Sequence, residues 1–149
     1  MSVSGDHYQA LRWIATAEDD PQAARSLERD GMYAHACFLA QQCAEEAVKA
    51  AWVRMGQDRW GHSIGALIRS FPPEVTPPQC VSWTEQAAAM DRYYIPRRYP
   101  NGLPDLTPGE SYFAADARSA IELGERFLDA SRAWLDAHAP GSSNITPDC

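Results

Sequence analysis

The sequence predicts an all-α protein, folded as an antiparallel up-and-down helical bundle of four long helices plus one short helix. Apolar residues recur at helical spacing, no segment shows the alternation typical of a strand, and Gly and Pro separate the apolar stretches. The 149 residues, 45% of them hydrophobic, are enough to bury one core. We expect one helical domain over residues 1–138 and a flexible tail over residues 139–149.

The first two helices are predicted from their end signals. Asp19-Asp20-Pro21 interrupts the first helix with two capping residues and a proline, so we expect a kink or a restart there. Gly31 should end this helix. The second helix should run from Tyr33 to Met55, because this stretch is rich in alanine, contains no Gly or Pro, and is followed by Gly56.

The second half of the chain predicts three more helices. A short amphipathic helix stops before Pro72-Pro73, Thr76-Pro77 starts the next, and Pro96 ends it. Thr107-Pro108-Gly109-Glu110 has the pattern of a capping box and should start the last helix. The short helix should bury Ile64, Leu67, Ile68 and Phe71. The last helix should bury Phe113, Ala117, Ala120, Ile121, Gly124, Phe127, Leu128, Ser131, Trp134 and Leu135.

Charge and composition narrow the function classes. The formal net charge of −7 disfavours general attraction to nucleic acid or to anionic membranes, although a local basic site remains compatible with it. No apolar run is long enough for a membrane helix, and no signal peptide is recognisable. The four cysteines show no CxxC spacing and the four histidines are scattered, so we expect a cytoplasmic protein without a metal site or cofactor.

A polar stripe lies beside the apolar face of the second helix. Helical geometry places this stripe in the same sector as large aromatic residues, so it should be at least half buried. One interpretation is structural, with an i,i+4 pair between Glu45 and Lys49 and glutamines that bond to neighbouring helices. The other is functional, with the stripe lining a groove or a dimer seam. The stripe consists of Gln41, Gln42, Glu45 and Lys49, and the aromatic residues are Phe38 and Trp52.

A basic and aromatic segment lies between the fourth and last predicted helices. Guanidinium groups can bind phosphates bidentately and tyrosine rings can stack on bases, which favours contact with a nucleotide or RNA. Alternatively, Arg97 or Arg98 is an internal clamp that pairs with Glu45 or another carboxylate. The segment contains Arg92, Tyr93, Tyr94, Arg97, Arg98 and Tyr99.

The order of these motifs resembles the HEPN family over roughly residues 8 to 135. The similar features are Trp13 with Ala17-Glu18-Asp19, the Gln41-Gln42-x-x-Glu45-x-x-x-Lys49 pattern, His62-Ser63-Ile64, and the segment from Tyr93 to Pro100. The resemblance implies a helical bundle that forms a homodimer. It also implies a nucleotide, RNA or nucleotidyltransferase partner, because many similar proteins are encoded beside a minimal nucleotidyltransferase in toxin–antitoxin pairs.

The chain departs from the pattern of HEPN ribonucleases, which carry an Arg followed four to six residues later by His. No histidine follows Arg97 or Arg98 at that spacing. Arg132 and His138 match formally, but six helical residues turn two side chains about 240° apart, so we interpret this match as coincidence. His62 should cap or pack the short helix, with a general base as the alternative.

Three functions follow from the sequence. The first is a dimeric module that binds a nucleotide, RNA or a nucleotidyltransferase partner. The second is a metal-independent ribonuclease toxin in which Arg97 or Arg98 stabilises the phosphorane and His62 or a tyrosine transfers protons. The third is a purely structural dimer.

Overall fold

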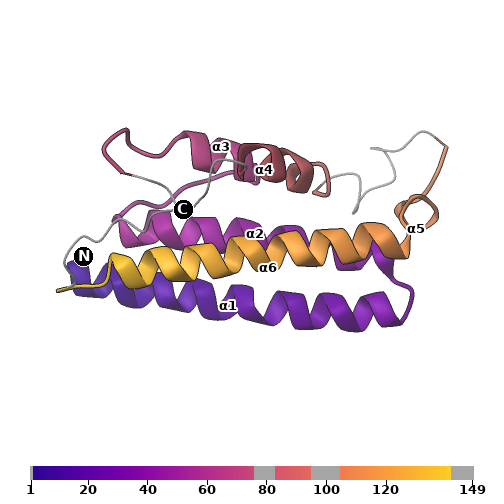
Figure 1. Ribbon diagram of the computed structural model, residues 1–149, viewed down its shortest axis with the longest axis horizontal. Helices are drawn as coiled ribbons and strands as arrows, with labels where there is room; N and C mark the ends of the chain where they lie inside the picture. Colours follow the sequence, from indigo (N-terminus) through magenta and orange to yellow (C-terminus); the bar gives the residue numbers. More distant parts are fainter. Residues whose placement is uncertain (1, 76–82, 95–104, 142–149) are drawn as a thin grey trace.

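The computed structural model describes residues 2–75, 83–94 and 105–141, and these residues form six helices and no strand (Figure 1). The all-α class is therefore confirmed. The described helices are α1 (Val3–Arg29), α2 (Tyr33–Arg54), α3 (Ile64–Arg69), α4 (Trp83–Asp91), α5 (Pro108–Ser111) and α6 (Ala114–Ala137).

Three long helices, α1, α2 and α6, form the body of the molecule (Figure 1). Helices α2 and α6 both run opposite to α1, and the segment that holds α3 and α4 returns the chain to the end where α6 begins. The predicted fourth helix is the nine-residue α4, and its expected start at Thr76-Pro77 lies outside the described residues. No helix in the described ranges is long and apolar enough to cross a membrane.

The α1–α2 hairpin follows from local signals. The Ser2 hydroxyl accepts from the Gly5 N–H at 3.2 Å and caps α1. Gly31 adopts a φ of 75°, and the Met32 N–H donates to the Leu27 carbonyl at 2.8 Å, which ends α1 as predicted. The predicted restart at Pro21 is wrong, because α1 continues through this residue, which is buried.

Helix α6 buries nine of the ten residues predicted for its core stripe. Gly124 allows α6 to approach α2 closely, since a Cβ at this position would lie 2.8 Å from the Ala40 carbonyl oxygen. The exception is Phe113, which is 66% exposed and contradicts the prediction. The Thr107 capping box starts only the four-residue α5, and Phe113 then precedes a second helix start, where its N–H donates to the Asp116 carboxylate at 2.8 Å.

Apolar side chains pack the segment of α3 and α4 against α2 and α6. The predicted face of α3 is buried. Phe71 lies against Trp52 with ring centroids 4.6 Å apart, and Trp83 of α4 contacts Phe127 of α6 edge-to-face at 4.1 Å. The Trp52 indole N–H donates to the Leu67 carbonyl at 3.2 Å, so its polar atom is also satisfied. This packing holds α3 against the C-terminal part of α2 and α4 against α6.

Candidate functional site

The polar stripe of α2 meets the residue that precedes the cap of α3. Glu45 is 4% exposed, and its Oε1 lies 2.8 Å from Lys49 Nζ and 3.1 Å from His62 Nδ1. Gln41 is fully buried and donates to Glu45 Oε2 at 3.3 Å and to the His62 carbonyl at 3.1 Å. Gln42 donates to Gln41 Oε1 at 2.9 Å. We call Gln41, Gln42, Glu45, Lys49 and His62 the polar cluster.

Hydrogen-bond donors of the polar cluster surround the buried carboxylate of Glu45. A nearly buried charge is costly unless it is paired and hydrogen-bonded, and Glu45 has both Lys49 and Gln41 beside it. The Glu45–Lys49 pair of the structural interpretation is therefore present. His62 differs from the other members because its side chain is 54% exposed, so one part of the polar cluster faces the surface.

Tyr94 joins the polar cluster to the basic and aromatic segment. Its ring stacks on His62 with centroids 4.4 Å apart and an interplanar angle of 15°, and it lies 6.1 Å from the Phe38 ring. Arg97, Arg98 and Tyr99 lie outside the described residues.

Asp91 fixes the relative position of His62 and Tyr94, and sequence reasoning missed it. Its carboxylate accepts from the Ile64 N–H at 2.6 Å, the Gly65 N–H at 3.1 Å and the Ser63 hydroxyl at 2.8 Å, so α4 caps the start of α3. Ser63, not His62, supplies the local N-cap, accepting from Ala66 N–H at 3.1 Å. A serine before an apolar run signals this cap, but no local signal reveals an Asp located 27 residues further along the chain.

Two buried carboxyl groups between α1 and α2 form a second polar group, which the sequence analysis did not predict. Asp20 of α1 and Glu46 of α2 each have one buried carboxyl oxygen without a hydrogen-bond partner among the described residues. Burial, and then the charge of Asp19, raise the pKa of Asp20 to about 6. Burial, and then the charges of Asp20 and Glu45, raise the pKa of Glu46 to about 7. Burial and nearby carboxylates also raise the pKa of the Cys43 thiol, which makes this cysteine unreactive.

The formal Arg132–His138 match does not form a pair. Arg132 pairs with Glu18 and lies 3.5 Å from Asp129, while the His138 ring stacks on Trp134 with centroids 3.9 Å apart. His138 Nδ1 contacts the Trp134 carbonyl at 2.7 Å. Arg92, the remaining predicted site residue, is exposed just after α4.

Comparison with known proteins identifies the family. The model of the HEPN domain matches residues 10–134 of the chain. The chain belongs to the HEPN family. The resemblance inferred from the order of the motifs is therefore confirmed, and the matched range includes every residue of the polar cluster and the basic and aromatic segment.

The chain is also similar to two solved structures and to one sequence relative. The chain is 34% identical to TT1696 of Thermus thermophilus, with a TM-score of 0.78, covering 84% of this chain and 97% of that one. It is 35% identical to ST0689, an archaeal HEPN homologue, with a TM-score of 0.69, covering 85% and 97%. It is also 26% identical to the candidate toxin MJ1304 of Methanocaldococcus jannaschii, covering 85% of this chain and 88% of the relative.

Proposed function

We propose that this HEPN protein is a cytoplasmic, dimeric module that binds a nucleotide or RNA beside the polar cluster and acts in a toxin–antitoxin pair with a nucleotidyltransferase. The observation that supports it most is the stacking of Tyr94 on the half-exposed His62. Tyr94 precedes Arg97, Arg98 and Tyr99 in the sequence, so its contact with His62 supports a site in which these residues act together with the polar cluster. The similarity to a candidate toxin supports the toxin–antitoxin part.

The chemistry of these groups suits a phosphate-bearing ligand with a base. Arginines bind phosphate bidentately, and aromatic faces stack on bases without reading their sequence. The net charge of −7 opposes such a ligand at long range, so binding depends on a local cationic cluster. The sequence places Arg92, Arg97 and Arg98 within seven positions of one another, which is the densest group of arginines in the chain.

A binding titration tests the ligand part of the proposal. We expect Arg97→Ala/Arg98→Ala to weaken binding of a short fluorescein-labelled single-stranded RNA, or of ATP, about tenfold at fixed salt. The melting temperature should stay nearly unchanged. Arg12→Ala/Arg126→Ala removes two exposed arginines from α1 and α6 and is the matched control for net charge. A large loss of stability with unchanged affinity would instead support the internal clamp.

The dimer and the nucleotidyltransferase partner of the proposal are tested separately. Light scattering should give a dimer at micromolar concentration, and a clean monomer would contradict this part. A nucleotidyltransferase gene beside the gene for this chain would support the toxin–antitoxin pairing, and co-purification of the two proteins would test it directly.

A second candidate is a metal-independent ribonuclease, and the Glu45–His62 contact favours it. A carboxylate on Nδ1 orients an imidazole and leaves Nε2 for proton transfer, as in the catalytic pairs of hydrolases. RNA cleavage by the purified protein in excess EDTA that is lost in His62→Ala, with RNA binding retained, would support this function. Cleavage that survives in this variant would rule out the role of His62.

A further inference from the structure

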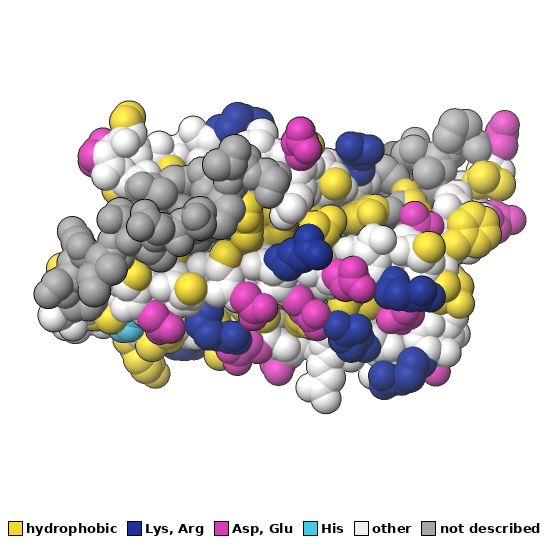
Figure 2. All heavy atoms as spheres, in the orientation of Figure 1, with side chains coloured by type: hydrophobic (Ala, Val, Ile, Leu, Met, Phe, Trp, Pro, Cys, Tyr) yellow, Lys and Arg dark blue, Asp and Glu magenta, His cyan; other side chains and the backbone are white. Residues whose placement is uncertain are grey.

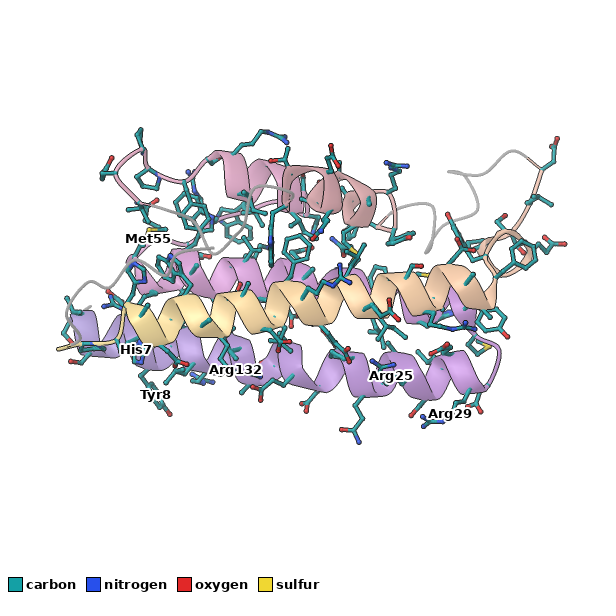
Figure 3. The ribbon with its side chains drawn as sticks, viewed as in Figure 1. His7, Tyr8, Arg25, Arg29, Met55 and Arg132 are labelled. Carbon is teal, nitrogen blue, oxygen red and sulfur yellow. The ribbon has the colours of Figure 1, made fainter. Side chains whose placement is uncertain are left out.

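The loop between α2 and α3 carries a tryptophan that lies almost wholly in solvent. Trp60 is 90% exposed, more than any other large hydrophobic residue in the described part of the chain. Met55, labelled in Figure 3, directly follows α2 and leads into this loop. We call residues 56–62 the Trp60 loop. Tryptophan is highly buried on average, so an indole left in water points to a contact that a ligand completes.

The neighbours of Trp60 anchor the Trp60 loop to the rest of the protein. The Arg59 guanidinium lies over the Trp52 ring of α2, 4.2 Å from its centroid. On the other side, His62 belongs to the polar cluster. Gly61 has a φ of 103°, a backbone conformation that residues with side chains rarely adopt. Trp60 is therefore presented to solvent between two residues that contact α2.

The stretch of sequence around Trp60 is basic in an otherwise acidic chain. Residues 49–73 contain one lysine and three arginines but one acid, and residues 92–104 contain three arginines and no acid. These two stretches hold seven of the 13 Lys and Arg residues and one of the 20 Asp and Glu residues. Each stretch supplies one ring of the stack between His62 and Tyr94. The basic parts of the sequence therefore meet two residues away from Trp60.

The arginines of α1 and α6 are placed differently. Arg25 Nη2 lies 2.7 Å from Glu125 Oε1, and Arg132 pairs with Glu18. Figure 2 shows side chains of both signs intermixed over these two helices. Arg59 instead contacts an aromatic ring, and it forms no ion pair with a carboxylate of the described residues. Its charge is therefore available to an anionic ligand beside Trp60.

We propose that Trp60 stacks on an unpaired base of the ligand, and that this ligand is single-stranded RNA. The inference rests on the proposed function and names the ligand class of its site. An aromatic side chain can stack on any base, because every base has a flat face, and arginines beside it bind the phosphates. A double helix covers these faces with neighbouring base pairs, so duplex RNA cannot use Trp60 in this way.

The affinity for a short fluorescein-labelled single-stranded RNA tests the role of Trp60. Trp60→Ala should weaken binding about tenfold, which is within the range that stacking of one base contributes. Trp60→Phe keeps a flat ring and should retain most of the affinity. Phe113→Ala is the matched control, because Phe113 is also an exposed aromatic residue but lies at the start of α6. The melting temperature of all three variants should match that of the wild type.

Fluorescence tests whether RNA contacts the indole of Trp60 itself. Trp52, Trp83 and Trp134 are buried and Trp13 is partly buried, so bound RNA should quench Trp60 most. This saturable quenching should disappear in Trp60→Phe although the RNA still binds. The slope of log affinity against log salt concentration should be equal in Trp60→Ala and the wild type, because stacking neutralises no phosphate.

Competition tests the strand state of the ligand. An unlabelled single strand should displace the labelled RNA at a concentration at least tenfold lower than a blunt duplex of the same sequence. A duplex that competes as well as the single strand would contradict the proposal, because its base faces are covered.

The outcomes separate this inference from the proposed function. Unchanged RNA affinity in Trp60→Ala would overturn the stacking role and leave the proposed ligand site standing, and so would binding of ATP without binding of RNA. A wild-type protein that binds neither would overturn both. A dimer that is lost in Trp60→Ala, as measured by light scattering, would assign Trp60 to an interface between copies and overturn the inference.

Discussion

At the scale of the residue, Glu45 is the centre of the candidate site. We expect Glu45→Gln to destabilise the protein by about 2–3 kcal/mol, because the mostly buried Lys49 loses its counter-charge and His62 loses the carboxylate that positions it. Urea unfolding measures this loss. Glu18→Gln removes the surface pair with Arg132 and should cost less than about 1 kcal/mol. Equal losses in the two variants would mean that the Glu45 contacts add no stability of their own.

Glu46 should make stability depend on pH. Its pKa is raised to about 7 in the folded protein, so the folded state holds a proton that the unfolded chain releases above its ordinary pKa near 4.5. The stabilisation that the protonated Glu46 contributes is complete below about pH 4.5. It decreases as the pH rises towards 7 and is lost above that pH. Glu46→Gln should therefore stabilise the protein at pH 8 by about 1 kcal/mol, after allowance for solvent screening, with little gain at pH 4.

Thermal unfolding at several pH values measures the effect of Glu46. The control is Glu122→Gln on the exposed face of α6, which should leave the pH profile of the wild type unchanged. A gain from Glu46→Gln that is equal at pH 4 and pH 8 would show that titration of this carboxyl is not the cause.

At the scale of the element, α3 depends on α4 for its start. Asp91→Ala should cost about 1–3 kcal/mol, because the N–H groups of Ile64 and Gly65 lose their acceptor. Glu85→Ala, on an exposed position of the same helix, should cost little. Hydrogen exchange of the α3 amides should speed up only in the first variant. Unchanged protection in Asp91→Ala would contradict the cap.

The contact of α6 with α2 depends on the absence of a side chain at Gly124. Gly124→Ala should destabilise the protein by about 1–3 kcal/mol, since its Cβ would lie 2.8 Å from the Ala40 carbonyl, and this outweighs the better helix propensity of alanine. Gly109→Ala is the control, because the nearest atom to its Cβ is 4.0 Å away. A Gly124→Ala variant as stable as the wild type would show that the two helices can separate at little cost.

Local signals account for most of the elements that the sequence predicted. Gly31, the alanine-rich run from Tyr33 and the spacing of the α6 stripe act through neighbouring residues, so their structural consequences could be read directly. Phe113 was misplaced because two helix starts lie close together and the Thr107 capping box hides the second. Pro21 was misread because burial against the rest of the bundle outweighs its local preference.

The candidate site was only partly predictable, for a related reason. The α2 side of the polar cluster follows from helical periodicity, since Gln41, Glu45 and Lys49 are four residues apart. The meeting of His62 with Glu45 and Tyr94 depends on how α3 and α4 pack over α2, and so does the cap from Asp91. No pattern within a single element encodes these distant contacts.

At the scale of the whole molecule, the polar cluster and the groove between α1 and α6 lie in different parts of the bundle. The polar cluster lies where α2 meets the segment of α3 and α4, whereas a groove of about 530 Å³ lies between α1 and α6, lined by Arg25 of α1 and Arg132 of α6 among others. In Figure 1, α1 lies on the opposite side of the α2–α6 layer from α3 and α4. The groove between α1 and α6 is therefore separate from the proposed ligand site.

The central claim is that a nucleotide or RNA binds beside His62. The most direct measurement is an NMR titration of histidine-labelled protein with a short single-stranded RNA, because the four histidines report on four separate places. We predict a saturable shift of the His62 ring signals that Arg97→Ala/Arg98→Ala removes, with His7, His35 and His138 unchanged. Bound RNA that leaves His62 unshifted and moves another histidine would contradict the account.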